Sequence, residues 1–150
     1  MTRAEKFSHY GVAVIALCAV LVSVWQMQAA QKHNRLSVRP FLETFTGWVG
    51  EGTWQISLSN HGIGPAIITK VEYEFGGKTY RQWDTVLDAA KLRADRRGSH
   101  NFNGKSYLAP GTEIEFLTLE RSQITNPLGI KIRMLYESVY EEPFVLQISV

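Results

Sequence analysis

The sequence predicts an all-β fold, an antiparallel β-sandwich of immunoglobulin-like or related topology, preceded by a single N-terminal transmembrane helix. Three observations support this. Residues 7–31 contain no Asp, Glu, Lys or Arg. From Leu36 onward, apolar and polar residues alternate with a period of two, which is typical of half-buried strands. Turn residues divide this part of the chain into about seven strands, which favours a sandwich, with a small barrel as the alternative.

The uncharged N-terminal segment predicts a membrane anchor over residues 1–33 and a β domain over residues 34–150. Residues 11–30 supply about 20 largely apolar positions, which is the length a helix needs to cross about 30 Å of hydrocarbon. Tyr10 and Trp25 lie near the two ends of this stretch, where aromatic rings favour the level of the lipid headgroups. We therefore expect a single-pass protein in contact with the lipid bilayer.

Two other interpretations of this segment stay open, a cleaved signal peptide and a buried core helix. Arg3 and Lys6 would form the basic start of a signal peptide, but cleavage after Ala29 or Ala30 lacks the small residue preferred at the −3 position. Basic residues flank the span almost equally on both sides, so the positive-inside rule separates the two orientations only slightly. We expect the domain to be exported, with a cytosolic domain as the alternative.

The predicted strands follow the alternating runs in order. The first is expected at a sheet edge because it contains Pro40. A short fourth strand would pair with the third across a Gly76-Gly77 hairpin turn. The predicted strands cover residues 36–42, 54–59, 66–75, 78–83, 113–116, 130–137 and 144–150.

One segment departs from the alternation. Asp84 can cap a helix that runs through VLDAAKLRAD and stops at Gly98, so we expect a helical insertion over residues 84–98. Lys91 and Asp95 would form a pair on successive turns of that helix. Residues 99–106 are expected to form a polar loop.

The most distinctive local string is NHGIGPA, which starts at Asn60. It predicts a tight structural turn in which the Asn60 side chain caps the chain, Gly62 or Gly64 has a positive φ, and Pro65 starts the next strand. We expect this turn to set the register of the two strands that flank it. A ligand-binding loop is the alternative, although the string is not followed by the Gly-Lys-Ser/Thr of a phosphate loop.

Three side chains are candidates for an interaction site. Trp48 lies in TGWVGEG, which we expect to be a glycine-flanked loop, and is expected to be exposed. Arg96 and Arg97 belong to the basic part of the insertion, which is either a solvated helix face or a contact for lipid headgroups. Trp54 and Tyr136, by contrast, share the apolar face of their strands and are expected in the core.

Composition excludes several classes of function. The sequence has 16 Lys and Arg against 14 Asp and Glu, a net charge of +2, which excludes a strongly basic nucleic-acid binder. The single cysteine, Cys18, lies in the predicted span, which excludes a disulfide framework. The four histidines have no metal-ligand spacing, so we expect no metal and no cofactor. Carboxylates on the later strands and the loop at 99–106 leave a small envelope hydrolase as an alternative.

The strings HNRLSVRPFL, NHGIGPAIITKVEYEF and YESVYEE, behind an N-terminal span, resemble a group of uncharacterised small bacterial single-pass membrane proteins. Their pattern is an Asn-Arg-Leu-Ser-Val-x-Pro strand, an Asn-x-Gly-x-Gly-Pro-Ala turn and a Tyr-x-Ser-x-Tyr hairpin. Glu141 departs from it, because a glycine often follows the second tyrosine. The resemblance covers most of the chain, implies the bacterial inner membrane, and implies no catalytic residues.

We therefore expect a membrane-anchored, non-catalytic module that binds a protein partner, a second copy of itself or the envelope, and that is exported to the periplasmic side. A cytosol-facing membrane sensor or effector is the first alternative, suggested by the basic residues Lys32, Arg35 and Arg39 after the span. The small envelope hydrolase is the second.

Overall fold

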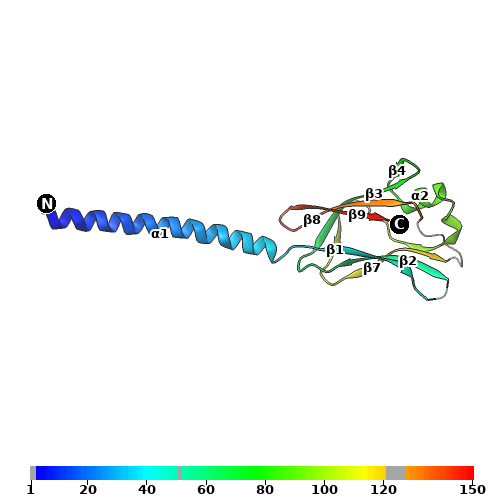
Figure 1. The fold of residues 1–150 in the computed structure, drawn as a ribbon, viewed down its shortest axis with the longest axis horizontal. Coiled ribbons are helices and arrows are strands. Elements are labelled where there is room, and N and C mark those ends of the chain that lie inside the picture. The colour runs from blue at the N-terminus through cyan, green and yellow to red at the C-terminus, as the bar shows by residue number, and fades with distance from the viewer. Residues whose placement is uncertain (1–2, 51, 121–127) are drawn as a thin grey trace. The chain divides into compact units, whose positions relative to one another are not determined.

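The structure, a computed structural model, describes residues 3–50, 52–120 and 128–150 (Figure 1). The chain divides into two compact units, the first ending at Ser37 and the second running over Val38–Val150. Within the described residues the second unit contains two antiparallel β-sheets, an arrangement consistent with a β-sandwich. This division after Ser37 lies four residues beyond the expected boundary between residues 33 and 34.

The first unit is one helix, α1 (Arg3–Leu36). Its part Tyr10–Leu36 is long and apolar enough to cross a membrane, with a mean hydropathy of 2.0 in its most apolar window. The helix extends past the predicted anchor because the backbone N–H of Ser37 still donates to the carbonyl of His33, at 2.9 Å, in the helical pattern. The first predicted strand, over 36–42, is consequently wrong at its start.

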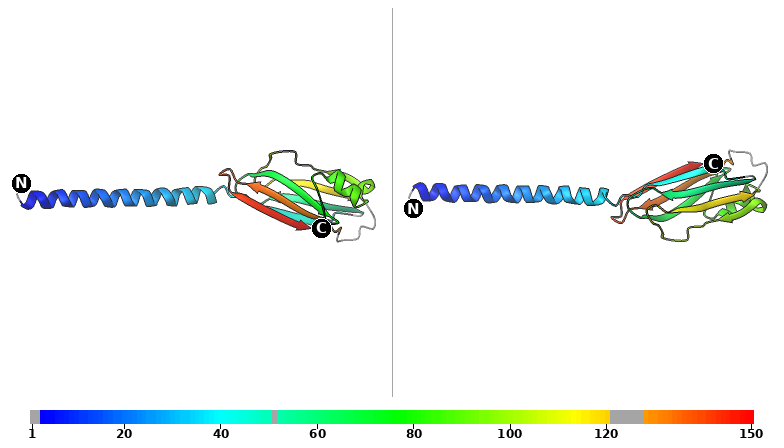
Figure 2. Two further views of the ribbon diagram at one scale, coloured as in Figure 1. Left: turned by 90° about the horizontal axis from the view of Figure 1, so that it is seen from above. Right: turned by 90° about the horizontal axis from the view of Figure 1, so that it is seen from below.

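Nine strands make up the two sheets of the described chain (Figures 1 and 2). Sheet A has the order β1-β2-β7-β5. Sheet B has the order β4-β3-β8-β9, and β6 pairs with one end of β3. The strands are β1 (Leu42–Trp48), β2 (Thr53–Asn60), β3 (Ala66–Phe75), β4 (Lys78–Tyr80), β5 (Arg96–Ser99), β6 (Ser106–Leu108), β7 (Glu113–Glu120), β8 (Lys131–Glu137) and β9 (Pro143–Ser149).

The inward-facing side chains of both sheets form one hydrophobic core. Trp54 is completely buried and Tyr136 is 7% exposed, which confirms the core positions predicted for both. The ring of Trp83 packs between Tyr73 and Phe116, with centroid distances of 4.4 and 5.1 Å. These tilted and edge-to-face arrangements are the favoured ones for aromatic pairs, and they join the two sheets at one end of the core.

The first strand lies six residues later than predicted, at β1. In this strand Thr44 and Thr46 pair with Leu58 and Ile56 of β2, and the pairing continues to Trp48 opposite Trp54. Trp48 is therefore the last residue of a strand and not a loop residue. The alternation in LETFTGW is weak because the strand lies at a sheet edge, where even its inward-facing threonines are half-buried.

The predicted helical insertion is mostly wrong in extent. A short helix, α2 (Trp83–Ala89), is followed by a single 3₁₀ turn, η1 (Arg93–Asp95), and then by β5. The helix ends early because Lys91 takes a left-handed backbone, with φ of 58°, so the predicted Lys91–Asp95 pair does not form as a helical contact. The sequence predicted a helix up to residue 98, but residues 96–98 belong to the extended strand β5 because they pair with β7.

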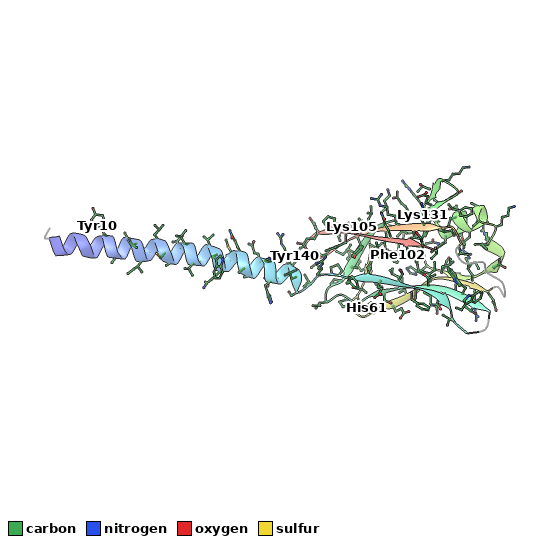
Figure 3. All side chains as sticks on the ribbon, in the orientation of Figure 1. Tyr10, His61, Phe102, Lys105, Lys131 and Tyr140 are labelled. Carbon is green, nitrogen blue, oxygen red and sulfur yellow. The ribbon has the colours of Figure 1, made fainter. Side chains whose placement is uncertain are left out.

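Two hairpin turns explain two sequence motifs. Gly76 and Gly77 both have positive φ, 58° and 75°, and join β3 to β4 as the predicted hairpin. In the β8–β9 turn (Figure 3), the hydroxyl of buried Ser138 accepts hydrogen bonds from the backbone N–H groups of Tyr140 and Glu142, at 3.2 and 3.3 Å. This bonding accounts for the serine at the centre of Tyr-x-Ser-x-Tyr.

Glu141 in the same turn has φ of 59°, a conformation in which glycine has no steric penalty. We predict that Glu141→Gly raises the free energy of unfolding by about 0.5 kcal/mol, because relief of left-handed strain exceeds the added entropy of the unfolded chain. Chemical denaturation of the full chain in detergent measures the change. Glu113→Gly, at the start of β7, should lower stability, and a loss of equal size in both variants would contradict the explanation.

Candidate interaction surface

The turn at residues 60–65 is built around the buried side-chain amide of Asn60. Its Oδ1 accepts hydrogen bonds from the backbone N–H groups of Phe41 and Gly62, at 3.2 and 3.0 Å. Its Nδ2 donates to the carbonyls of Gly64 and Leu108, at 2.9 and 3.0 Å. The predicted capping role of Asn60 is confirmed, and it extends to two segments that lie far away in the sequence.

The predicted positive φ at Gly62 or Gly64 is wrong, because neither glycine is among those with a left-handed backbone. Glycine is required at these positions for space. A Cβ on Gly62 would lie 2.3 Å from the backbone nitrogen of Phe41, and one on Gly64 would lie 1.8 Å from the carbonyl oxygen of Val38. The backbone over 38–41 thus packs directly on the turn.

The turn connects strands of two different sheets, whereas the sequence predicted that it would set the register between its flanking strands. β2 belongs to sheet A and β3 to sheet B, so residues 60–65 carry the chain from one sheet to the other and do not set a hairpin register between them. Pro65 directly precedes β3, as expected. The close approach to residues 38–41 makes this turn a structural element of the domain and leaves little backbone free for a ligand.

We predict that Gly64→Ala lowers the free energy of unfolding by at least about 2 kcal/mol, because the new Cβ must displace the backbone at Val38. The melting temperature of the full chain should fall by roughly 8 °C or more. Gly98→Ala is the matched control, since nothing lies within 4 Å of its added Cβ. Equal melting temperatures for the two variants would show that the turn is not held by this contact.

Arg96 and Arg97 have different environments. Arg96 forms an ion pair with Asp84, the residue predicted to cap the helix, and so joins β5 to α2. Arg97 is exposed on the outer face of sheet A, next to a shallow hollow. The other residues that line this hollow are Val49, Thr53, Gln55, Gly98, Glu115 and Thr118. Of the two arginines, Arg97 alone keeps the exposure that an interaction residue needs.

Trp48 lies at the end of β1, and its neighbour Val49 lines the hollow next to Arg97. Its partner Trp54 faces the core, so Trp48 occupies an inward-facing position at a sheet edge, where 45% of the residue stays exposed. β9 runs along the same side of the domain (Figure 2). We call this side, formed by β1 and β9, the open side, because neither strand has a second neighbour in its sheet among the residues that the structure describes.

The open side combines exposed aromatic and half-buried aliphatic groups. Leu146 and Ile148 of β9 face inward but are only half-buried, in contrast to the fully buried side chains of the central strands. Val145 faces outward and is 51% exposed. Sequence reasoning placed these residues in a closing strand but did not identify them as surface. The available signal was the run PFVLQIS, which contains no charged residue.

Among the described residues, burial or an ion pair explains the shifted pKa values of Tyr73, Glu72 and Lys105, the last of which is raised by its hydrogen bond to Glu137. Burial raises the pKa of the Tyr73 hydroxyl, which therefore stays neutral inside the core. A hydrogen bond from Lys70, at 2.6 Å, lowers the pKa of the Glu72 carboxyl on the outer face of sheet B. The carboxylates that suggested a hydrolase are divided between the sheets, with Glu115 on β7 and Glu137 on β8. In the described ranges, no group of three or more His, Cys, Asp and Glu side chains is arranged to hold a metal ion.

Comparison with models of protein families gives a match to most of the chain. A family model described as a domain of unknown function, DUF8453, matches residues 7–150, which includes both the apolar helix and the β domain. No curated protein matches the sequence.

Proposed function

The chain belongs to the DUF8453 family, a domain of unknown function, and we propose that this member is a membrane-anchored, non-catalytic module that binds another protein or a component of the cell envelope. The observation that carries the proposal is the open side of the domain, where Trp48 and the strand β9 stay exposed. An immunoglobulin-like type for the two-sheet domain is part of the same proposal.

The anchor in this proposal is α1. Its apolar part, Tyr10–Leu36, has 27 residues and is about 40 Å long as a helix. This length exceeds the thickness of the hydrocarbon core of a bilayer, which is about 30 Å. The family match begins at residue 7, so the family model includes the apolar segment. We place the protein in a bacterial inner membrane with the β domain on the periplasmic side.

A binding role fits the surface of the domain better than a catalytic role. Aromatic residues such as tryptophan are enriched at protein interfaces, and exposed apolar groups beside an unpaired strand mark interaction sites. Two of the carboxylates on which the hydrolase alternative rested, Glu115 on β7 and Glu137 on β8, lie on different sheets and do not form the adjacent pair that hydrolysis needs. The open side is therefore the preferred contact surface.

We predict that a photoreactive amino acid at Trp48, introduced into the full chain in native membranes, forms one adduct of defined mass. Trp48 is chosen because it lies on the open side and is 45% exposed. The same photoreactive residue at Tyr107, which is 70% exposed but lies on β6, is the control and should form no adduct. Only monomeric protein from both positions would overturn the proposed binding role.

The orientation separates the proposal from a cytosol-facing sensor. We predict that Val139→Cys, in a Cys18→Ser background, reacts with a membrane-impermeant maleimide before the inner membrane is broken. Val139 is suitable because it is 48% exposed in the β8–β9 turn. Reaction only after lysis would place the domain in the cytosol and favour the sensor.

A further inference from the structure

The hydrogen bonding of β9 determines which of its backbone groups face the open side. Ile130 and Val150 exchange both backbone hydrogen bonds, at 3.0 and 2.9 Å, just beyond the paired ends of β8 and β9. Hydrogen-bonded and non-hydrogen-bonded pairs alternate along an antiparallel ladder. The backbone N–H groups of Val145, Gln147 and Ser149 therefore point away from β8.

The opposite end of the hairpin gives the same alternation. The N–H of Ser138 donates to the carbonyl of Glu142 at 3.0 Å, as a hydrogen-bonded pair does. When hydrogen-bonded and non-hydrogen-bonded pairs are counted from either end of the hairpin, the backbone N–H groups of the same three residues of β9 face outward. These residues, Val145, Gln147 and Ser149, are all exposed. This edge therefore presents a row of backbone donors and acceptors with no neighbouring strand in the described chain.

Other edge strands have the features that prevent edge pairing. β4 and β5 are only three and four residues long, and they carry Lys78 and the pair Arg96 and Arg97. β6 has three residues, and β1 carries Glu43. β9, by contrast, has seven residues and no charge, and its only protective feature is Pro143 at its first position. A long uncharged edge of this kind is a template for another strand.

We propose that the outward edge of β9 binds an extended segment of a partner protein, which adds to sheet B as a further strand. This inference rests on the proposed binding function and specifies how the partner is recognised. Main-chain hydrogen bonds to Val145, Gln147 and Ser149 supply affinity, and alternate side chains of the segment supply specificity. The inward-facing side chains of the bound segment lie over the open side, between Ile148 of β9 and Trp48 of β1. These side chains must therefore be apolar.

The direction of β9 favours a separate segment over a second copy of the chain. β9 begins where the chain enters the domain, because the guanidinium of Arg39 lies 5.2 Å from the ring centroid of Phe144. Two copies of β9 paired antiparallel would put their entry ends at opposite ends of the joint sheet, about 20 Å apart over seven residues. Two helices in one membrane would then have to connect to opposite ends of the pair.

The test uses the full chain in detergent micelles and a fluorescent peptide of alternating valine and threonine as the probe. We predict that Gln147→Pro weakens peptide binding at least tenfold, because it removes an outward N–H and places a ring on the edge. Gln147→Ala is the matched control and should bind like the parent, since it keeps that N–H. A peptide N-methylated at every residue should not bind the parent.

A second pair of variants tests the edge without proline. Val145→Lys adds a charge beside the edge, whereas Val139→Lys adds the same charge to a valine of similar exposure, 48% against 51%, in the turn. Only the first should weaken binding. Thermal melts followed by the fluorescence of buried Trp54 and Trp83 check that each variant is folded.

Three results would overturn the inference: no binding of the peptide to the parent, equal binding by Gln147→Pro and Gln147→Ala, or disulfide-linked dimers of a Gln147→Cys chain in the Cys18→Ser background. The third would assign the edge to a second copy. The Trp48 adduct reports on the proposed function separately. An adduct that persists in the Gln147→Pro chain would leave that function standing and remove only the strand-addition mechanism.

Discussion

The buried amide of Asn60 is the interaction on which the rest of the domain depends. Its side chain forms hydrogen bonds with Phe41 of the entry segment, residues 38–41, through which the chain enters the domain. It also bonds to Gly62 and Gly64 of the crossing turn, residues 60–65, which carries the chain from one sheet to the other, and to Leu108 of β6. Its backbone carbonyl accepts from Gly111 at 2.8 Å, and its N–H donates to Thr112 at 3.0 Å. An unsatisfied buried polar group costs about 1–3 kcal/mol, so a side chain that satisfies two donors and two acceptors holds these segments in one arrangement.

That arrangement decides where the chain crosses between the sheets. Because the entry segment packs directly on Gly62 and Gly64, the crossing turn lies where the chain enters the domain. β1 then forms the edge of sheet A, and the β8–β9 hairpin places β9 at the edge of sheet B on the same side. The open side is thus a consequence of the connectivity, and the proposed binding surface follows from it.

The two other sheet edges differ from the open side in how they are covered. β5 is short, carries two arginines, and is joined to α2 by the ion pair of Arg96 with Asp84. α2 in turn places Trp83 in the core against Tyr73. The insertion therefore covers the side that lies away from β1 and β9, and within the described part of the domain the long edge strands lie on the open side.

The sequence by itself determined the apolar helix, the all-β class and most strand positions, because each depends on local period and composition. Residues 7–31 lack charge, and the runs at β2, β3 and β8 alternate clearly. The Gly76-Gly77 turn could also be predicted from local sequence, because both residues take positive φ angles that glycine adopts without steric cost. Trp54 and Tyr136 were placed in the core by the same alternation.

Only the tertiary structure decided the features that depend on contacts between distant segments. Gly62 and Gly64 are needed because another stretch of backbone lies against them, and no local pattern carries that information. β5 became a strand through pairing with β7, against its helical propensity, and Trp48 ended a strand through pairing with Trp54. The exposure of the β9 edge has the same origin, because a strand is at an edge only when the fold places no neighbour beside it.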